Sequence, residues 1–145
     1  MDKKIAFFDI DGTLINVPTG LMSPTEETIR ALNQFQAQGN LIFVATSRGA
    51  LPFQADDLHF DGFVGEDGHY IVYDGQVLVN DLFTADEVRR LIEVFQKYDG
   101  RCMYHSHQNS WCDCWEDEYI QRHRKAFSHT TEKPANLIEK LDADS

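Results

Sequence analysis

Two carboxylates separated by one residue, Asp9 and Asp11, are the residues of this sequence best placed to do chemistry. They follow a short apolar run that starts at Ile5, and Gly12 comes directly after them. If that run is a buried strand, both acids lie at its carboxyl end, where ligands bind in open α/β sheets. Gly12 lets the backbone come close to a ligand and turn N–H groups toward it. Because Mg²⁺ prefers carboxylate oxygens, we expect Asp9 and Asp11 to bind this cation.

With a cation present, two carboxylates can divide a phosphoryl transfer between them. One carboxylate attacks phosphorus and forms an aspartyl-phosphate, which splits one difficult displacement into two easier ones. The other protonates the departing oxygen and later takes a proton from water. The alternative is an acidic loop that only caps the strand. Charged residues at the end of a buried strand seldom serve stability, so we favour the chemical role.

The apolar pattern of the first 45 residues predicts the elements that position these side chains. The run Ile5–Asp9 is typical of a strand buried on both faces of a parallel sheet. The segment Ser23–Glu26 supplies a cap residue, a proline for the first helical turn and a capping-box glutamate, so a helix should begin there and end at Gly39. A second apolar run, Leu41–Ala45, predicts a strand parallel to the first. Both strands then end in polar residues at the same edge of the sheet.

The segment Asp9–Leu14 reads Asp-Ile-Asp-Gly-Thr-Leu and resembles the first motif of the haloacid dehalogenase (HAD) superfamily. The resemblance implies that Asp9 is the nucleophile and Asp11 the general acid/base. It also implies Mg²⁺ as the cofactor, with Asp9 and Asp11 as metal-binding residues, and Gly12 as part of the phosphate site.

The residues after the second strand extend the resemblance. Thr46, Ser47 and Arg48 are similar to the second motif of the superfamily, in which a hydroxyl holds the transferring phosphoryl group. That role falls on Thr46, for which an ordinary ST-turn is the alternative. The Cof-type sugar-phosphate phosphatases of the superfamily usually have threonine, glycine and arginine here, so Ser47 replaces a glycine. We expect Ser47 and Arg48 to contribute to phosphate binding.

The next part of the chain follows the element order of the Cof-type relatives. Gly62–Gly65 predicts a third short strand, after a short helical or irregular stretch at Leu51–Leu58. Asp74-Gly75 between two apolar runs is a strong β-hairpin signal. Thr84–Glu87 predicts a capping box at the start of a helix. Where the relatives have asparagine, glycine and alanine after the third strand, this chain departs from the pattern with Gly65–Tyr70.

The implied fold is α/β, with a HAD-like Rossmannoid three-layer core and an inserted α+β cap domain, both incomplete in these residues. We place the N-terminal half of the core at residues 1–82 and a partial cap at residues 83–145. Within the cap, Arg101–His107 and Trp111–Trp115 predict two strands, and Glu116–Phe127 predicts a helix.

Two further elements that the resemblance implies, a lysine and a later glycine-aspartate segment, are not found in these residues. Without them, Asp9, Asp11 and a substrate phosphate would lie close together around an incompletely held Mg²⁺. Each pair of like charges at about 4 Å costs on the order of 4 kcal/mol at an effective dielectric constant near 20. We therefore expect catalysis by this chain alone to be very weak. In the family, later strands lie beside the first one. Without them Ile5–Asp9 is an exposed edge, so we expect the chain to associate with itself or with a complementing chain there.

Composition excludes some other classes of function. The 13 basic and 24 acidic residues give a formal net charge of −11, which argues against a nucleic-acid partner. No apolar run approaches the roughly 20 residues of a membrane helix. The three cysteines are an odd number in one segment, which fits a reducing compartment. We expect a cytoplasmic protein without a membrane partner.

A cluster of thiols and imidazoles lies in the second half of the chain: Cys102, His105, His107, Cys112 and Cys114. These side chains are the ligands that zinc prefers. Their spacing fits no established zinc pattern. We favour a hairpin of the cap that covers the active site, with zinc as the alternative.

The sequence thus supports two functions of different classes. The first is a Mg²⁺-dependent phosphatase that acts on a small phosphorylated metabolite. The second is a non-catalytic HAD-like domain that binds metal or a partner chain. A phosphomutase would use the same first motif.

Overall fold

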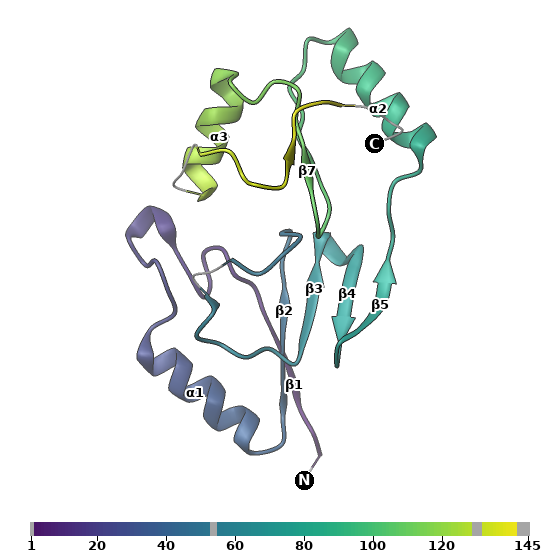
Figure 1. The fold of residues 1–145 in the computed structure, drawn as a ribbon. Coiled ribbons are helices and arrows are strands. Elements are labelled where there is room, and N and C mark those ends of the chain that lie inside the picture. Colours follow the sequence, from purple (N-terminus) through teal and green to yellow (C-terminus); the bar gives the residue numbers. More distant parts are fainter. Residues whose placement is uncertain (1, 53–54, 129–131, 142–145) are drawn as a thin grey trace. The chain divides into compact units, whose positions relative to one another are not determined.

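The computed structural model describes residues 2–52, 55–128 and 132–141. Internal contacts divide the chain into two compact units, Met1–Asp81 and Leu82–Ser145. Figure 1 shows the helices and strands of both units.

The first unit is built on a five-stranded sheet in the order β1-β2-β3-β4-β5. The strands are β1 (Ile5–Phe8), β2 (Leu41–Ala45), β3 (Gly62–Gly65), β4 (Tyr70–Tyr73) and β5 (Gln76–Asn80). Strands β1, β2 and β3 are parallel, whereas β4 and β5 form the antiparallel hairpin that the sequence predicted at Asp74-Gly75. Both turn residues have positive φ, 51° and 71°, as a two-residue hairpin of this kind requires. The α/β fold is confirmed, with a mixed sheet in which the first three strands are parallel.

The helix α1 (Glu26–Ala37) connects β1 to β2. Its N-cap is Thr25, whose hydroxyl accepts a hydrogen bond from the Thr28 N–H at 3.2 Å. The predicted cap at Ser23 is therefore wrong, because Thr25 is the extended residue that satisfies a free N–H of the first turn. Gly39 follows the helix with a φ of +84°, as predicted for its end. The predicted short helical stretch at Leu51–Leu58 includes residues 53 and 54, which lie outside the described residues.

The core of this unit lies on the face of the sheet that α1 covers. Its buried members are Ile10, Leu14, Ile15, Val17, Leu32, Ile42, Val44, Ala55 and Leu58. The helix contributes Leu32, with Ile29 and Phe35 packed beside it. Two of these core residues, Ile42 and Val44, alternate along β2, as the period of a strand requires.

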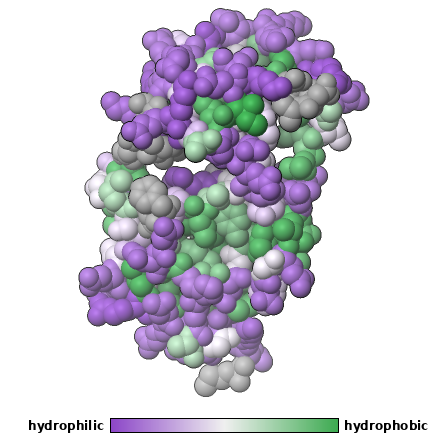
Figure 2. All heavy atoms as spheres, in the orientation of Figure 1, coloured by the Kyte–Doolittle hydropathy of each residue, from purple (hydrophilic) through white to green (hydrophobic). Residues whose placement is uncertain are grey.

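The opposite face of the sheet carries an apolar row that stays partly open. Ile5 is 53% and Phe7 60% exposed, so the prediction that the first strand is buried on both faces is wrong. The Phe7 and Phe43 ring centroids are 5.3 Å apart, and those of Phe43 and Tyr73 are 5.4 Å apart, so the row runs across three strands. Figure 2 shows apolar side chains gathered over the strands of this unit. In the described sheet β1 is an edge strand, as predicted.

The second unit contains two helices and a small sheet. The elements are α2 (Ala85–Lys97), β6 (Tyr104–His105), β7 (Ser110–Trp111), α3 (Glu118–Ser128) and β8 (Leu137–Ile138). The capping box predicted at Thr84 is present, with reciprocal bonds between Thr84 and Glu87. The two predicted cap strands are shorter than expected, and β7 pairs with β8 as well as with β6. Among the described residues, no helix is both long and apolar enough to cross a membrane.

Candidate active site

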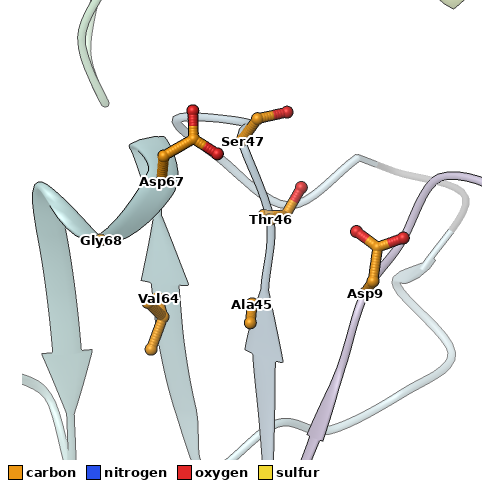
Figure 3. Close-up of a pocket in the computed structure, with 7 residues that line it drawn as sticks. All are labelled: Asp9, Ala45, Thr46, Ser47, Val64, Asp67 and Gly68. Carbon is orange, nitrogen blue, oxygen red and sulfur yellow. The ribbon is translucent and has the colours of Figure 1, made fainter.

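A pocket opens at the carboxyl ends of β1, β2 and β3 in the first unit. It has a volume of about 410 Å³. Figure 3 shows the described residues that line it: Asp9, Ala45, Thr46, Ser47, Val64, Asp67 and Gly68. Each of the three parallel strands delivers at least one of these residues, because their carboxyl ends share one edge of the sheet. Three of the six predicted site residues, Asp9, Thr46 and Ser47, are therefore brought together.

Asp9 is placed by a tightly bonded loop. The N–H groups of Leu14 and Ile15 both donate to the Ile10 carbonyl at 3.0 Å, and the side chains of Ile10 and Ile15 are fully buried. The Thr13 hydroxyl donates to Asp9 Oδ2 at 3.2 Å. The Asp9 carboxylate therefore faces the pocket from a loop that is anchored in the core.

Gly12 has the positive φ, +86°, that its position in this loop requires. Its N–H donates to the Ile15 carbonyl at 2.7 Å. Gly12 is not among the described residues that line the pocket. In this arrangement its N–H stabilises the loop, and a contact with phosphate stays a prediction.

Asp11 and Arg48 form a bidentate ion pair beside the pocket. Arg48 Nε donates to Asp11 Oδ2 at 2.7 Å, and Arg48 Nη2 donates to Asp11 Oδ1 at 2.7 Å. The hydrogen bond with Asp11 raises the pKa of Arg48 above its ordinary value. Neither residue is among those that line the pocket in the described part of the chain. Each Asp11 oxygen accepts one hydrogen bond and keeps a lone pair, but Asp11 does not line the pocket, so a role there as metal ligand or acid/base requires this pair to move.

Thr46 combines the two roles that the sequence left open. It is 7% exposed, and its N–H donates to the Val64 carbonyl at 2.9 Å, which fixes it to β3. Its hydroxyl oxygen accepts from the Arg48 N–H at 3.2 Å, the bond of an ST-turn. A hydroxyl that accepts one bond still has its own hydrogen to donate. Thr46 can therefore hold the turn and donate to an oxygen in the pocket.

Asp67 and Gly68 were not predicted as site residues. They belong to the short helix η3 (Glu66–Gly68), which follows β3 and lines the pocket from the side opposite β1. The signal that could have identified them is their position directly after the third parallel strand, at the edge where Asp9 and Thr46 also lie.

The residues of the pocket fit part of a Mg²⁺ site. Mg²⁺ is commonly held by one or two carboxylates together with substrate phosphate and water. Asp9 supplies a carboxylate of that kind in the pocket. Within residues 2–52, 55–128 and 132–141, no group of three or more His, Cys, Asp or Glu side chains is arranged to hold a metal ion.

The thiols of the second unit lie in partly buried surroundings. Cys112 and Cys114 share a side, with Sγ atoms 3.9 Å apart, and both are free cysteines. Burial raises the pKa of Cys114 to about 12 and also raises the pKa of Cys102. Zinc binds the thiolate. In the metal-free chain these thiols are protonated at neutral pH, and among the residues that the structure describes no three His, Cys, Asp or Glu side chains converge as a metal site, which disfavours the zinc alternative.

Residues 6–145 match the family model of the haloacid dehalogenase-like hydrolases. The chain belongs to this family. The resemblance seen in the sequence at Asp9–Leu14 is thereby confirmed. YkrA of Bacillus subtilis (strain 168) is 31% identical to the HAD chain over 97 residues, which are 64% of this chain and 36% of YkrA.

Two solved structures show the same fold. A protein of Geobacillus kaustophilus HTA426 is 28% identical, with a TM-score of 0.72, over 86% of this chain and 48% of that protein. The HAD subclass IIB sugar phosphatase BT4131 is 25% identical, with a TM-score of 0.76, over 98% of this chain and 54% of that protein. The HAD chain thus spans about half the length of these two structures and less of YkrA. The match to subclass IIB agrees with the predicted Cof-type branch. The partial coverage agrees with the prediction that these residues correspond to the N-terminal part of such a protein.

Proposed function

We propose that this HAD chain contributes the nucleophile and phosphate site of a Mg²⁺-dependent phosphatase that acts on a small phosphorylated metabolite. The observation that carries the proposal is the shared pocket of the Asp9 carboxylate and the Thr46 hydroxyl, at the ends of adjacent parallel strands. The similarity to a sugar phosphatase, BT4131, supports the substrate class.

In the proposed reaction Asp9 attacks phosphorus, and the bond from phosphorus to the leaving oxygen breaks as the aspartyl-phosphate forms. The Thr46 and Ser47 hydroxyls orient the phosphoryl oxygens. Asp11, released from Arg48, donates a proton to the leaving oxygen and later takes one from water. Asp9 would hold Mg²⁺, which when bound neutralises negative charge around the phosphoryl group.

The Asp11–Arg48 pair has a consequence for this reaction. A guanidinium freed from Asp11 is a ready partner for a phosphate oxygen, because its fork of donors matches phosphate as well as carboxylate. Substrate phosphate and Asp11 would then compete for Arg48, and phosphate binding would release the acid/base. This role for Arg48 agrees with the phosphate contact expected from the sequence.

A second candidate is a non-catalytic domain that binds a cation or a partner chain. It is favoured by the closed Asp11–Arg48 pair and by the open face of β1, where Ile5 and Phe7 are exposed. We propose that a second copy or a complementing chain covers this edge, and that residues 83–145 are part of a cap domain.

Hydrolysis of p-nitrophenyl phosphate by the purified chain, with and without Mg²⁺, separates the two candidates. We expect weak, Mg²⁺-dependent turnover that Asp9→Asn abolishes. The matched control is Asp57→Asn, which removes an exposed carboxylate outside the pocket and should keep the activity. Equal turnover by the native chain and Asp9→Asn, or none in either, would favour the non-catalytic candidate.

A further inference from the structure

The pocket contains a second carboxylate that the proposed reaction does not use. Asp67 comes from η3 and lies across Thr46 and Ser47 from Asp9 (Figure 3). Asp9 follows β1 and Asp67 follows β3, two strands away. With a spacing of about 4.8 Å between neighbouring strands, the backbones that carry the two acids are about 10 Å apart. Asp67 is exposed, and among the described residues none donates a hydrogen bond to its carboxylate. Its charge is therefore free to meet a ligand.

The backbone fixes Asp67 in an unusual conformation. Glu66 and Asp67 both have positive φ, 50° and 54°, followed by Gly68 at 99°. Consecutive residues of this kind are costly without glycine and persist only where surrounding contacts hold them, often at ligand sites. The contacts are present here, since the Glu66 N–H donates to the Arg48 carbonyl at 3.1 Å and the His69 N–H donates to the Glu66 carbonyl at 3.1 Å. The loops after β2 and β3 thus hold Asp67 at the mouth of the pocket.

The position of Asp67 relative to Asp9 determines which part of a substrate it meets. In phosphoryl transfer the attacking and leaving oxygens lie roughly in line on opposite sides of phosphorus. With Asp9 on one side of the pocket and the phosphoryl group beside Thr46, the leaving group points toward the other side, where Asp67 lies. A carboxylate there repels anionic leaving groups and attracts cations and hydroxyl donors.

We infer that Asp67 is a specificity-determining residue, which selects phosphomonoesters whose leaving group carries hydroxyl or ammonium groups and rejects those with a second negative charge. The inference rests on the proposed function, because it takes Asp9 as the nucleophile. A unit charge about 6 Å from Asp67 changes affinity about tenfold at an effective dielectric constant near 40.

The test is the binding of three phosphomonoesters that differ in the charge of the leaving group. Phosphoethanolamine, glycerol phosphate and phosphoglycerate are titrated in the presence of Mg²⁺ into the full chain, with chemical shifts of the Ser47 and Gly68 amides as the signal. The variant is Asp67→Asn, because asparagine tolerates positive φ. The control, Asp74→Asn, removes one charge at another positive-φ position, in the β4–β5 turn.

The native chain and Asp74→Asn should bind phosphoethanolamine more tightly than phosphoglycerate, and Asp67→Asn should reduce this preference about tenfold or more. If the esters bind in an Asp9-dependent way but Asp67→Asn keeps the preference, the inference is wrong and the proposed function stands. If no ester binds the native chain, the proposed function fails and the inference with it. A loss of Mg²⁺ affinity in Asp67→Asn, titrated without ester, would overturn the inference by making Asp67 a metal ligand.

Discussion

Asp61 joins three segments of the first unit, and its removal gives a quantitative test of the structure. Its Oδ2 accepts from the Ile42 N–H at 2.8 Å and from Gln36 Nε2 at 2.8 Å. Hydrogen bonds to a charged acceptor contribute about 1.5–3 kcal/mol each. Ile42 is 1% exposed and both hydrogen bonds are part-buried, so water replaces the lost acceptor only in part. We expect Asp61→Ala to lower the free energy of unfolding by about 3 kcal/mol.

The assay is urea unfolding of the full chain, followed by circular dichroism. With an m-value of about 1.5–2 kcal/mol per molar, the midpoint should fall by roughly 1.5–2 M. The control is Asp57→Ala, which removes an exposed carboxylate and should change the free energy of unfolding by less than about 0.5 kcal/mol.

The effect of Asp61 should also depend on pH. Burial raises the pKa of Asp61, but the hydrogen bonds from Ile42 and Gln36 together bring it below its ordinary value. A carboxyl whose pKa is lower in the folded state stabilises the fold above the unfolded pKa, about 3.9, and loses this effect as pH falls through the folded pKa. The difference between native chain and Asp61→Ala should therefore be full at pH 7 and shrink below about pH 4. A difference that is absent at pH 7, or equally large at pH 2.5, would refute the reasoning.

Three further predictions concern other contacts. In a double-mutant cycle of Asp11→Ala and Arg48→Ala, urea unfolding should give a coupling of about 0.5–1 kcal/mol, and a coupling of zero would contradict the bidentate pair. Thr84→Ala should destabilise α2 by about 1 kcal/mol, measured by hydrogen exchange of its amides; unchanged exchange would argue against the capping box. Phe7→Glu places a charge on the exposed face of β1 and should reduce any self-association measured by light scattering, whereas a chain that is monomeric at high concentration before the change would contradict the proposed edge contact.

The parts of the fold that the sequence predicted are governed by local patterns. The hairpin at Asp74-Gly75 depends on two residues that accept positive φ, and the helix after Thr84 depends on a capping box of four residues, Thr84–Glu87. The wrong prediction of Ser23 as the N-cap of α1 also comes from a local pattern. Ser23 and Thr25 both offer a hydroxyl before the helix, and only the backbone conformation decides which one accepts from the first turn.

Local patterns also explain why only part of the site was predicted. Asp9 and Thr46 stand directly after strong apolar runs, so their place at the sheet edge follows from strand periodicity. Asp67 was missed because the segment after β3 departs from the family pattern, and its place in the pocket depends on η3 bonding back to Thr46 and Arg48.

The sequence by itself determined the order of the strands and helices from β1 to α3, the family, and the delivery of Asp9 to the end of a strand, because periodicity, caps and turns act between near neighbours. Only the tertiary structure decided that Asp11 pairs with Arg48, 37 residues away, and that Phe7 lies on the open face of the sheet. Both depend on which distant segments pack together and which face of the sheet is covered, and neither property is contained in a local pattern.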